Sequence, residues 1–245
     1  MAEEQSGGEC FQRGITFRFG DCCSRGHASL HSMLKLFSEL AGDDCESRGL
    51  GRETLLGSGL LFLLSRMSLR VERAPVIGET VAARTWETET SGPYFRRKYE
   101  MLDGTGKVLV SGSGLWFLTD PATRKIMRPS SLDVGTRRRE ERRSGCQKRG
   151  KLRLPETMPS LGSRPVYRSD IDFNNHVNNA VYGAIAEDFL PEAYWSRELR
   201  CFDIDYNSET KPGETLELFG EGSEAGFVMK GISGAALRFC CEFGF

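Results

Sequence analysis

Acidic, amide and imidazole side chains are concentrated in one short stretch of this sequence, and their spacing could support chemistry. They are Asp170, Asp172, Asn174, Asn175, His176, Asn178 and Asn179. From Val177 onward, apolar residues recur at the spacing of one helix face, and Pro191 ends the pattern. Carboxylates and imidazoles can move protons. The first turn of a helix offers unpaired N–H groups that can stabilise an oxygen gaining negative charge. The stretch therefore predicts a reactive site at the entrance to a helix that is buried on one face.

The composition is that of a globular protein with a sizeable core. The chain has 245 residues, of which 39% are hydrophobic and 27% charged, and its net charge of −1 argues against a nucleic-acid polycation. The longest apolar run, Leu60–Leu64, is too short to span a membrane. Residues 1–5 are acidic and polar, unlike a signal or transit peptide, so we expect a cytoplasmic protein. The eight cysteines contain no C-x-x-C pair, which favours reduced thiols over a zinc site or disulfides.

The predicted elements follow the same order in both halves of the chain. Each half has a strand, a turn, a helix and a run of strands, with helices expected at about 28–41 and 177–190. Gly42 is expected to end the first helix, and 42–59 is expected to be a glycine-rich loop. The later strands are expected at 60–73, 79–89, 94–102, 107–118, 199–208, 214–221, 225–232 and 235–244.

A repeated Gly-Glu-Thr word, at Gly78–Thr80 and Gly213–Thr215, indicates that this order is an internal duplication. A helix with one apolar face and an antiparallel sheet form a natural two-layer unit. The sequence therefore predicts an α+β protein with domains at 14–120 and 164–245, joined by a basic linker at 121–163.

The motif Asp-x-Asn-x-His-Val-Asn-Asn before a helix resembles the signature of plant and bacterial acyl-acyl carrier protein thioesterases. Leu64–Met67, Gly78–Thr80 and Leu115–Phe117 are similar to parts of the first domain of that family. The similarity extends from about residue 14 to 230. It implies a double (tandem) hot-dog fold, with two antiparallel sheets each wrapped on a central helix. The N-terminal domain would shape the acyl pocket and the C-terminal domain would be catalytic.

The resemblance also assigns roles to single residues. It places the catalytic aspartate of the family on Asp172, its asparagine on Asn174 and its histidine on His176. A second functional segment of the family aligns with Glu209, which is followed by Thr210 where the plant enzymes have a cysteine. This departure weakens a cysteine-nucleophile mechanism and leaves Glu209 as the informative match.

Thioester hydrolysis needs an attacking group, a holder for the oxyanion and a proton for the thiolate, of which the last is the least demanding. Asp172 or Glu209 would activate water, and direct attack by a carboxylate stays open. His176 would hydrogen-bond the carbonyl or hold the water, and Asn174 would orient either group. We expect the backbone N–H of Val177 to donate to the oxyanion. The alternative is that the aspartate and asparagine residues only cap a helix.

Other candidate groups each have a functional and a structural interpretation. Met33, Leu34, Phe37 and Met67 are candidate acyl-binding residues or ordinary core residues. The pair His27 and His31 has the i, i+4 spacing of metal ligands, but no further ligand completes a site, so packing or surface positions are expected.

The linker is locally basic, with ten Lys or Arg against three Asp or Glu between Arg128 and Arg153. It could be a solvated segment, or it could attract an acidic carrier protein. The docking candidates are Arg137, Arg138, Arg142 and Arg143.

The sequence thus favours an enzyme that hydrolyses fatty acyl-acyl carrier protein thioesters, with acyl carrier protein as its partner. No metal or redox cofactor and no nucleic-acid partner is implied. The alternatives are an acyl-CoA thioesterase of the same fold and a non-catalytic binder of acyl carrier chains. The oligomeric state stays open, and a homodimer is one option.

Overall fold

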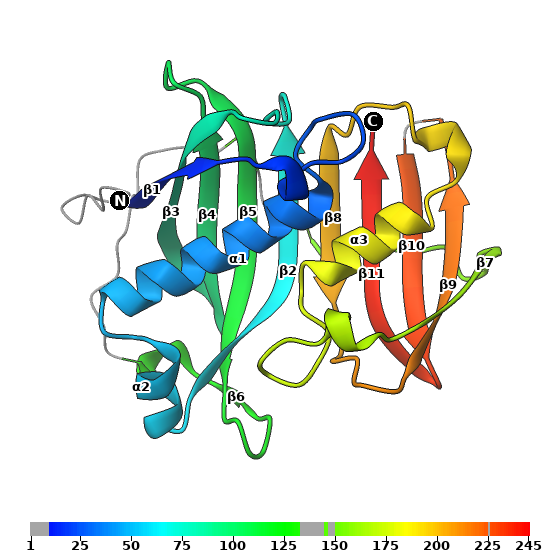
Figure 1. Cartoon of the computed structure of the whole chain (residues 1–245). Coiled ribbons are helices and arrows are strands. Elements are labelled where there is room, and N and C mark those ends of the chain that lie inside the picture. Colours follow the sequence, from blue (N-terminus) through cyan, green and yellow to red (C-terminus); the bar gives the residue numbers. More distant parts are fainter. Residues whose placement is uncertain (1–9, 133–144, 147–149, 225) are drawn as a thin grey trace. The chain divides into compact units, whose positions relative to one another are not determined.

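The computed structural model describes residues 10–132, 145–146, 150–224 and 226–245. It divides into two compact units, one up to Gln147 and the other from Lys148 to Phe245, which we call unit 1 and unit 2. Each unit combines antiparallel strands with few helices (Figure 1). Among the described residues, no helix has both the length and the apolar character needed to cross a membrane.

Unit 1 is built on an antiparallel sheet with the strand order β1-β3-β4-β5-β2, and β6 pairs with β5. These strands are β1 (Phe11–Thr16), β2 (Leu61–Val71), β3 (Thr80–Ser91), β4 (Tyr94–Leu102), β5 (Val108–Thr119) and β6 (Ile126–Met127). The predicted turn at Asp103–Gly106 is confirmed, because the N–H of Gly106 donates to the Asp103 carbonyl at 2.9 Å. Strands β2 to β5 agree with their predicted spans to within about two residues. Strand β1 begins at Phe11, before the expected domain start at residue 14, and β6 was not predicted, since it lies in the segment expected to be the linker.

The long helix of unit 1, α1 (Leu30–Ser47), lies across one face of this sheet (Figure 1). Ser29 caps its start, where Oγ accepts the Ser32 N–H at 3.1 Å. The ring of Phe37 is buried and stacks on Tyr99 of β4 at 4.7 Å between ring centroids. A side chain at Gly112 of β5 would collide with that ring, so the glycine permits the close approach of helix and sheet.

The predicted end of this helix at Gly42 is wrong, because α1 continues to Ser47. Asp44 lies beyond the glycine and is completely buried, where its Oδ2 accepts from Arg97 at 2.7 Å and from Arg48 at 3.0 Å. Both arginines also reach Glu87, at 2.6 and 2.8 Å. This buried ionic network favours continued helix past the glycine. A further short helix, α2 (Arg52–Gly57), occupies part of the segment that was expected to be a loop.

Unit 2 has an antiparallel sheet with the strand order β8-β11-β10-β9-β7. Its elements are β7 (Ser160–Pro165), α3 (Val181–Asp188), β8 (Cys201–Tyr206), β9 (Thr215–Gly222), β10 (Gly226–Ser233) and β11 (Ala236–Gly244). Helix α3 crosses the face of its own sheet (Figure 1). Its buried residues are Tyr182, Gly183, Ile185 and Ala186. The apolar spacing predicted a face through Val181, Ala184 and Ile185, of which only Ile185 is fully buried in α3, so the helix is rotated from the expected orientation.

Short 3-10 helices precede or follow several of these elements. They are η1 (Phe19–Asp21), η2 (Pro129–Ser131), η3 (Arg168–Asp170) and η4 (Glu192–Tyr194). The polar stretch from Asp172 to Asn179 lies in the chain between η3 and α3, so this loop positions the candidate site.

Candidate active site

The polar stretch folds into a tight loop, Asp172–His176, whose flanking residues Ile171 and Val177 form an antiparallel bridge. The N–H of Asp172 donates to the His176 carbonyl at 3.0 Å, and the N–H of Asn175 donates to the Asp172 carbonyl at 3.0 Å. Asn175 has a φ of 64°, a left-handed conformation that asparagine tolerates better than most residues. The loop geometry therefore places the side chains of Asp172 and His176 close together.

Asp170 holds the start of the loop in place through hydrogen bonds of its side chain and its carbonyl. Its Oδ2 accepts from Arg164 and from the Tyr167 N–H, both at 2.7 Å, and its carbonyl accepts the Asn178 N–H at 2.9 Å. Burial alone would raise the pKa of Asp170, but the hydrogen bonds from the Arg164 guanidinium and the Tyr167 N–H hold that pKa below its usual range. Asp170 is thus a structural residue.

The predicted triad of side chains comes together in unit 2. Nδ1 of His176 lies 3.8 Å from Oδ1 of Asp172, and Nε2 of His176 lies 3.2 Å from Oε1 of Glu209. Glu209 comes from the segment between β8 and β9, so the fold joins groups that are distant in sequence. The three side chains keep 22%, 13% and 29% of their surface exposed, for Asp172, His176 and Glu209 respectively, so an incoming substrate could reach them.

Amide groups of the loop hold the carboxylate of Asp172. The backbone N–H of Asn174 donates to Oδ1 at 2.8 Å, and Nδ2 of Asn178 approaches Oδ2 at 3.5 Å. The orienting role expected of the Asn174 side chain is therefore performed here by its backbone N–H. Any role for the side chain itself stays a prediction. Asn178 is a contact to the site that the motif contained but that we did not single out from the sequence.

The prediction for Val177 is wrong in this structure. Its N–H donates to the carbonyl of Thr210 at 2.9 Å, so it is not available to an oxyanion. The helix also begins later than the apolar pattern indicated, at Val181, because Asn178 forms a turn in which its Oδ1 accepts the Ala180 N–H at 2.9 Å. The first turn of α3 is therefore not directly adjacent to His176 in the chain.

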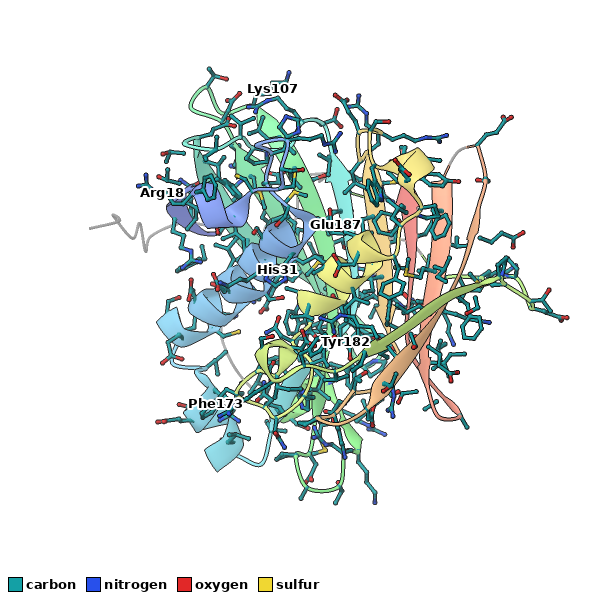
Figure 2. All side chains as sticks on the ribbon, turned by 45° about the vertical axis from the view of Figure 1, so that its right-hand side comes forward. Arg18, His31, Lys107, Phe173, Tyr182 and Glu187 are labelled. Atoms are coloured by element: carbon teal, nitrogen blue, oxygen red, sulfur yellow. The ribbon has the colours of Figure 1, made fainter. Side chains whose placement is uncertain are left out.

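The tip of the loop is strongly exposed. Phe173 projects from it with 86% of its surface accessible (Figure 2). Arg168 in η3 and Lys211 after Thr210 are also exposed. The segments that carry them are joined by two backbone bonds, Val166 N–H to Glu214 and Val177 N–H to Thr210, both at 2.9 Å. An aromatic ring and two cations thus lie on the segments that form the site.

Unit 1 contains a second copy of the loop without the acidic groups. Cys22 bridges Ala28, the Cys23 N–H donates to the His27 carbonyl at 2.8 Å, and the Gly26 N–H donates to the Cys23 carbonyl at 2.9 Å. Gly26 has a φ of 76°, in the place of Asn175. The Ala28 N–H donates to the Pro75 carbonyl at 2.7 Å, as Val177 does to Thr210.

His27 therefore corresponds to His176, while Cys23 and Ala74 replace Asp172 and Glu209. His27 precedes α1, so the helical spacing that we noted for His27 and His31 does not exist. Among the described residues, no group of three or more His, Cys, Asp or Glu side chains is arranged to hold a metal ion.

The other predicted site residues lie elsewhere. Met33, Leu34, Phe37 and Met67 are all buried in unit 1, each no more than 2% exposed. Their role in acyl binding stays a prediction. Arg137, Arg138, Arg142 and Arg143 lie outside the described residues.

Comparison with known proteins gives a consistent result. The family model for the acyl-ACP thioesterase N-terminal domain matches residues 8–131, and the model for the C-terminal domain matches residues 159–233. The chain is 26% identical over 228 residues to the chloroplastic acyl-[acyl-carrier-protein] hydrolase FATB2 of Cuphea viscosissima, covering 86% of this chain and 54% of the relative. It is 26% identical over 210 residues to the chloroplastic oleoyl-acyl carrier protein thioesterase of Coriandrum sativum, covering 78% and 56%. The chain thus spans about half the length of these curated relatives.

Solved structures show the same fold over nearly the whole chain. An acyl-ACP thioesterase from Bacteroides thetaiotaomicron superposes with a TM-score of 0.88 at 21% identity, covering 97% of this chain and 98% of that one. The 12:0-ACP thioesterase of Umbellularia californica gives a TM-score of 0.78 at 19% identity, covering 97% of each chain.

Proposed function

Because the chain belongs to the acyl-ACP thioesterase family, we propose that it hydrolyses fatty acyl-acyl carrier protein thioesters to free fatty acid and carrier thiol. The observation that supports this activity in the chain itself is the convergence of Asp172, His176 and Glu209. Two carboxylates on either side of an imidazole can activate water and pass its proton onward.

The distances between the three side chains indicate a separate role for each of them. Glu209 and His176 are within 3.2 Å, the range of proton transfer, so this pair handles the proton of the attacking water. Asp172 is farther from the ring, at 3.8 Å, and its Oδ1 already accepts from Asn174, so it orients the imidazole and stabilises its positive charge. The thiolate leaves readily and needs little help from an acid.

Unit 2 would carry the chemistry and unit 1 would bind the acyl chain. The absence of acidic residues at Cys23 and Ala74 supports this division, because the His27 loop has no carboxylate at either place. Met33 and Phe37 are buried on α1, the helix that packs on the sheet of unit 1, and their contact with the acyl chain is part of this proposal. We also propose that each unit is a hot-dog, with its sheet curved around the helix. The seating of Phe37 against Tyr99 and Gly112 supports this for unit 1.

A direct assay tests the activity. Purified protein is incubated with acyl-acyl carrier protein and, separately, with the matching acyl-CoA, and free fatty acid is measured by mass spectrometry. We expect release from the carrier substrate and a loss of about 10²–10⁴ in kcat for Glu209→Gln, the usual size of a general-base contribution. His176→Ala should lose at least about tenfold, because the imidazole links both carboxylates.

The assay also separates the alternatives. Preferential hydrolysis of acyl-CoA would favour the CoA thioesterase. Tight binding of the acyl carrier without release would favour a non-catalytic binder. Release by Glu209→Gln and His176→Ala at the wild-type rate would show that the triad is not the active site.

A further inference from the structure

Arg238 of the sheet binds the segment that carries Glu209 through hydrogen bonds. Nη1 of Arg238, on β11, donates to the Glu209 carbonyl at 2.7 Å, and Nη2 donates to Oε1 of Glu214 at 2.8 Å. The guanidinium also reaches Oγ of Ser208 at 3.3 Å. These contacts fix the backbone of residue 209 from the side of the sheet.

Thr210 fixes the same backbone from the side of the helix. It is completely buried, and its carbonyl accepts the Val177 N–H at 2.9 Å. Its hydroxyl accepts a hydrogen bond from the Tyr182 hydroxyl, also at 2.9 Å. Because Thr210 follows Glu209 and Val177 follows His176, the backbone bond controls how far apart the two reacting side chains lie.

Tyr182 is itself held firmly in α3. It is 3% exposed, and its ring packs against Tyr206 and Phe239 with centroids 5.7 and 5.1 Å away. Burial raises the pKa of the Tyr182 hydroxyl, so it stays protonated and can donate. The Tyr206 hydroxyl in turn donates to the Asn179 carbonyl at 3.1 Å, which ties the start of α3 to β8.

The duplicated loop shows that the hydroxyl pair is not needed to fold such a loop. In unit 1 the same backbone bond, from Ala28 to Pro75, forms at 2.7 Å although proline has no hydroxyl to offer. The hydrogen bond between Thr210 and Tyr182 is therefore an addition of unit 2 to a loop that closes without it in unit 1. The unit in which they occur is also the one that brings an acid to the histidine.

We propose that Thr210 and Tyr182 are positioning residues, a buried hydroxyl pair that sets the distance between Glu209 and His176 for catalysis. This inference rests on the proposed function. It also assigns Thr210 no nucleophilic role, since its hydroxyl is engaged by Tyr182 inside the helix–loop contact.

Four variants test the proposal: Thr210→Val, Tyr182→Phe, the double variant and Thr210→Ser. Thr210→Val and Tyr182→Phe should each lower kcat about tenfold and leave KM within about twofold, because small misplacements of catalytic groups reduce the rate of the chemical step. The double variant should be no slower than either single one, since both remove the same bond. Thr210→Ser keeps the hydroxyl and should restore most of the rate.

A matched control is Tyr194→Phe, which removes another tyrosine hydroxyl bond in unit 2, the one to the Ser223 carbonyl at 3.2 Å. It should leave kcat unchanged. Wild-type kcat in Thr210→Val and Tyr182→Phe would overturn the proposal. If Thr210→Val were inactive while Tyr182→Phe kept full rate, Thr210 would be a nucleophile and the proposal would likewise fail.

Amide hydrogen exchange gives a readout that does not depend on activity. The Val177 amide should exchange faster in Thr210→Val and Tyr182→Phe than in the wild type or in Tyr194→Phe, because the bond to Thr210 is loosened. Unchanged exchange at Val177 would overturn the positioning role even in a protein that hydrolyses nothing. Absence of thioesterase activity in the wild type would overturn only the proposed function.

Discussion

Replacing Asp172 by asparagine should separate the chemistry of the site from the folding of its loop. The carboxylate accepts one strong turn bond, from the Asn174 N–H to Oδ1 at 2.8 Å. Asparagine keeps an oxygen acceptor there and is as good as aspartate in such turns. Cys23 occupies the matching place in the unit 1 loop, which closes with the same backbone bonds. We therefore expect Asp172→Asn to change the free energy of unfolding by no more than about 0.5 kcal/mol.

The loss of the negative charge should nevertheless reduce turnover. When His176 takes up a proton, the Asp172 carboxylate stabilises the resulting charge from 3.8 Å. Two charges about 4 Å apart interact by about 1 kcal/mol in water and about 4 kcal/mol near a protein surface. Asp172 is 22% exposed, so its contribution lies between these limits. At about 1.4 kcal/mol per tenfold, this corresponds to a loss of about 5-fold to 10³-fold in kcat, and we expect at least about tenfold.

The assay measures free fatty acid by mass spectrometry, because the protein has partly exposed free cysteines that would react with thiol reagents. Asp172→Ala serves as the comparison. It also removes the turn acceptor and should cost about 1 kcal/mol, which is about 2–4 °C in Tm for a chain of this size. If Asp172→Asn folds normally and turns over at the wild-type rate, the aspartate is only a turn residue and the electrostatic reasoning is refuted.

The remaining predictions concern the support and the surface of the site. The substitution Arg164→Met should destabilise the protein by about 1.5–3 kcal/mol at pH 7. Because the pKa of Asp170 is lowered in the folded protein, this difference in stability should disappear as the pH falls through and below the usual aspartate range. Urea unfolding measures it, and a difference that stays constant from pH 7 to pH 3 would contradict the prediction. Charge reversal at Arg168 and Lys211 should raise KM for the acyl carrier several-fold and reduce its salt dependence, with no effect on an uncharged short thioester. If neutralising Arg137, Arg138 and Arg139 raises KM more than the change at Arg168 and Lys211 does, docking depends on the linker instead.

Regular strands were predictable from the sequence, while the ends of helices were not. The alternation of apolar and polar residues located β4 and β5 and the turn between them, because each of these depends on neighbours in the chain. Gly42 is a local signal to end a helix, but α1 continues since Asp44 is fixed by Arg97 from a distant strand. Likewise, the apolar pattern from Val177 begins before α3 does, because Asn178 forms its own turn.

The same limit applies to the site. The motif identified Asp172 and His176, and the resemblance pointed to Glu209, which the fold brings to the ring. The role expected of Val177 failed because the partner of its N–H, Thr210, belongs to another segment of the chain. Such a pairing has no local signature. Thr210 did attract notice in the sequence, but only as the residue that stands where the plant enzymes have a cysteine.

The two loops of this chain show which part of the site belongs to the fold. Both close with the same backbone bonds, and both carry a histidine at the same place, His27 or His176. A histidine there is thus compatible with a loop that has no carboxylate beside it, and its presence alone does not indicate catalysis. What distinguishes unit 2 is the pair of acids that reach its ring and the hydroxyl pair behind them. It follows that a variant which leaves the backbone bonds intact but neutralises Asp172 or Glu209 should change the rate far more than the stability.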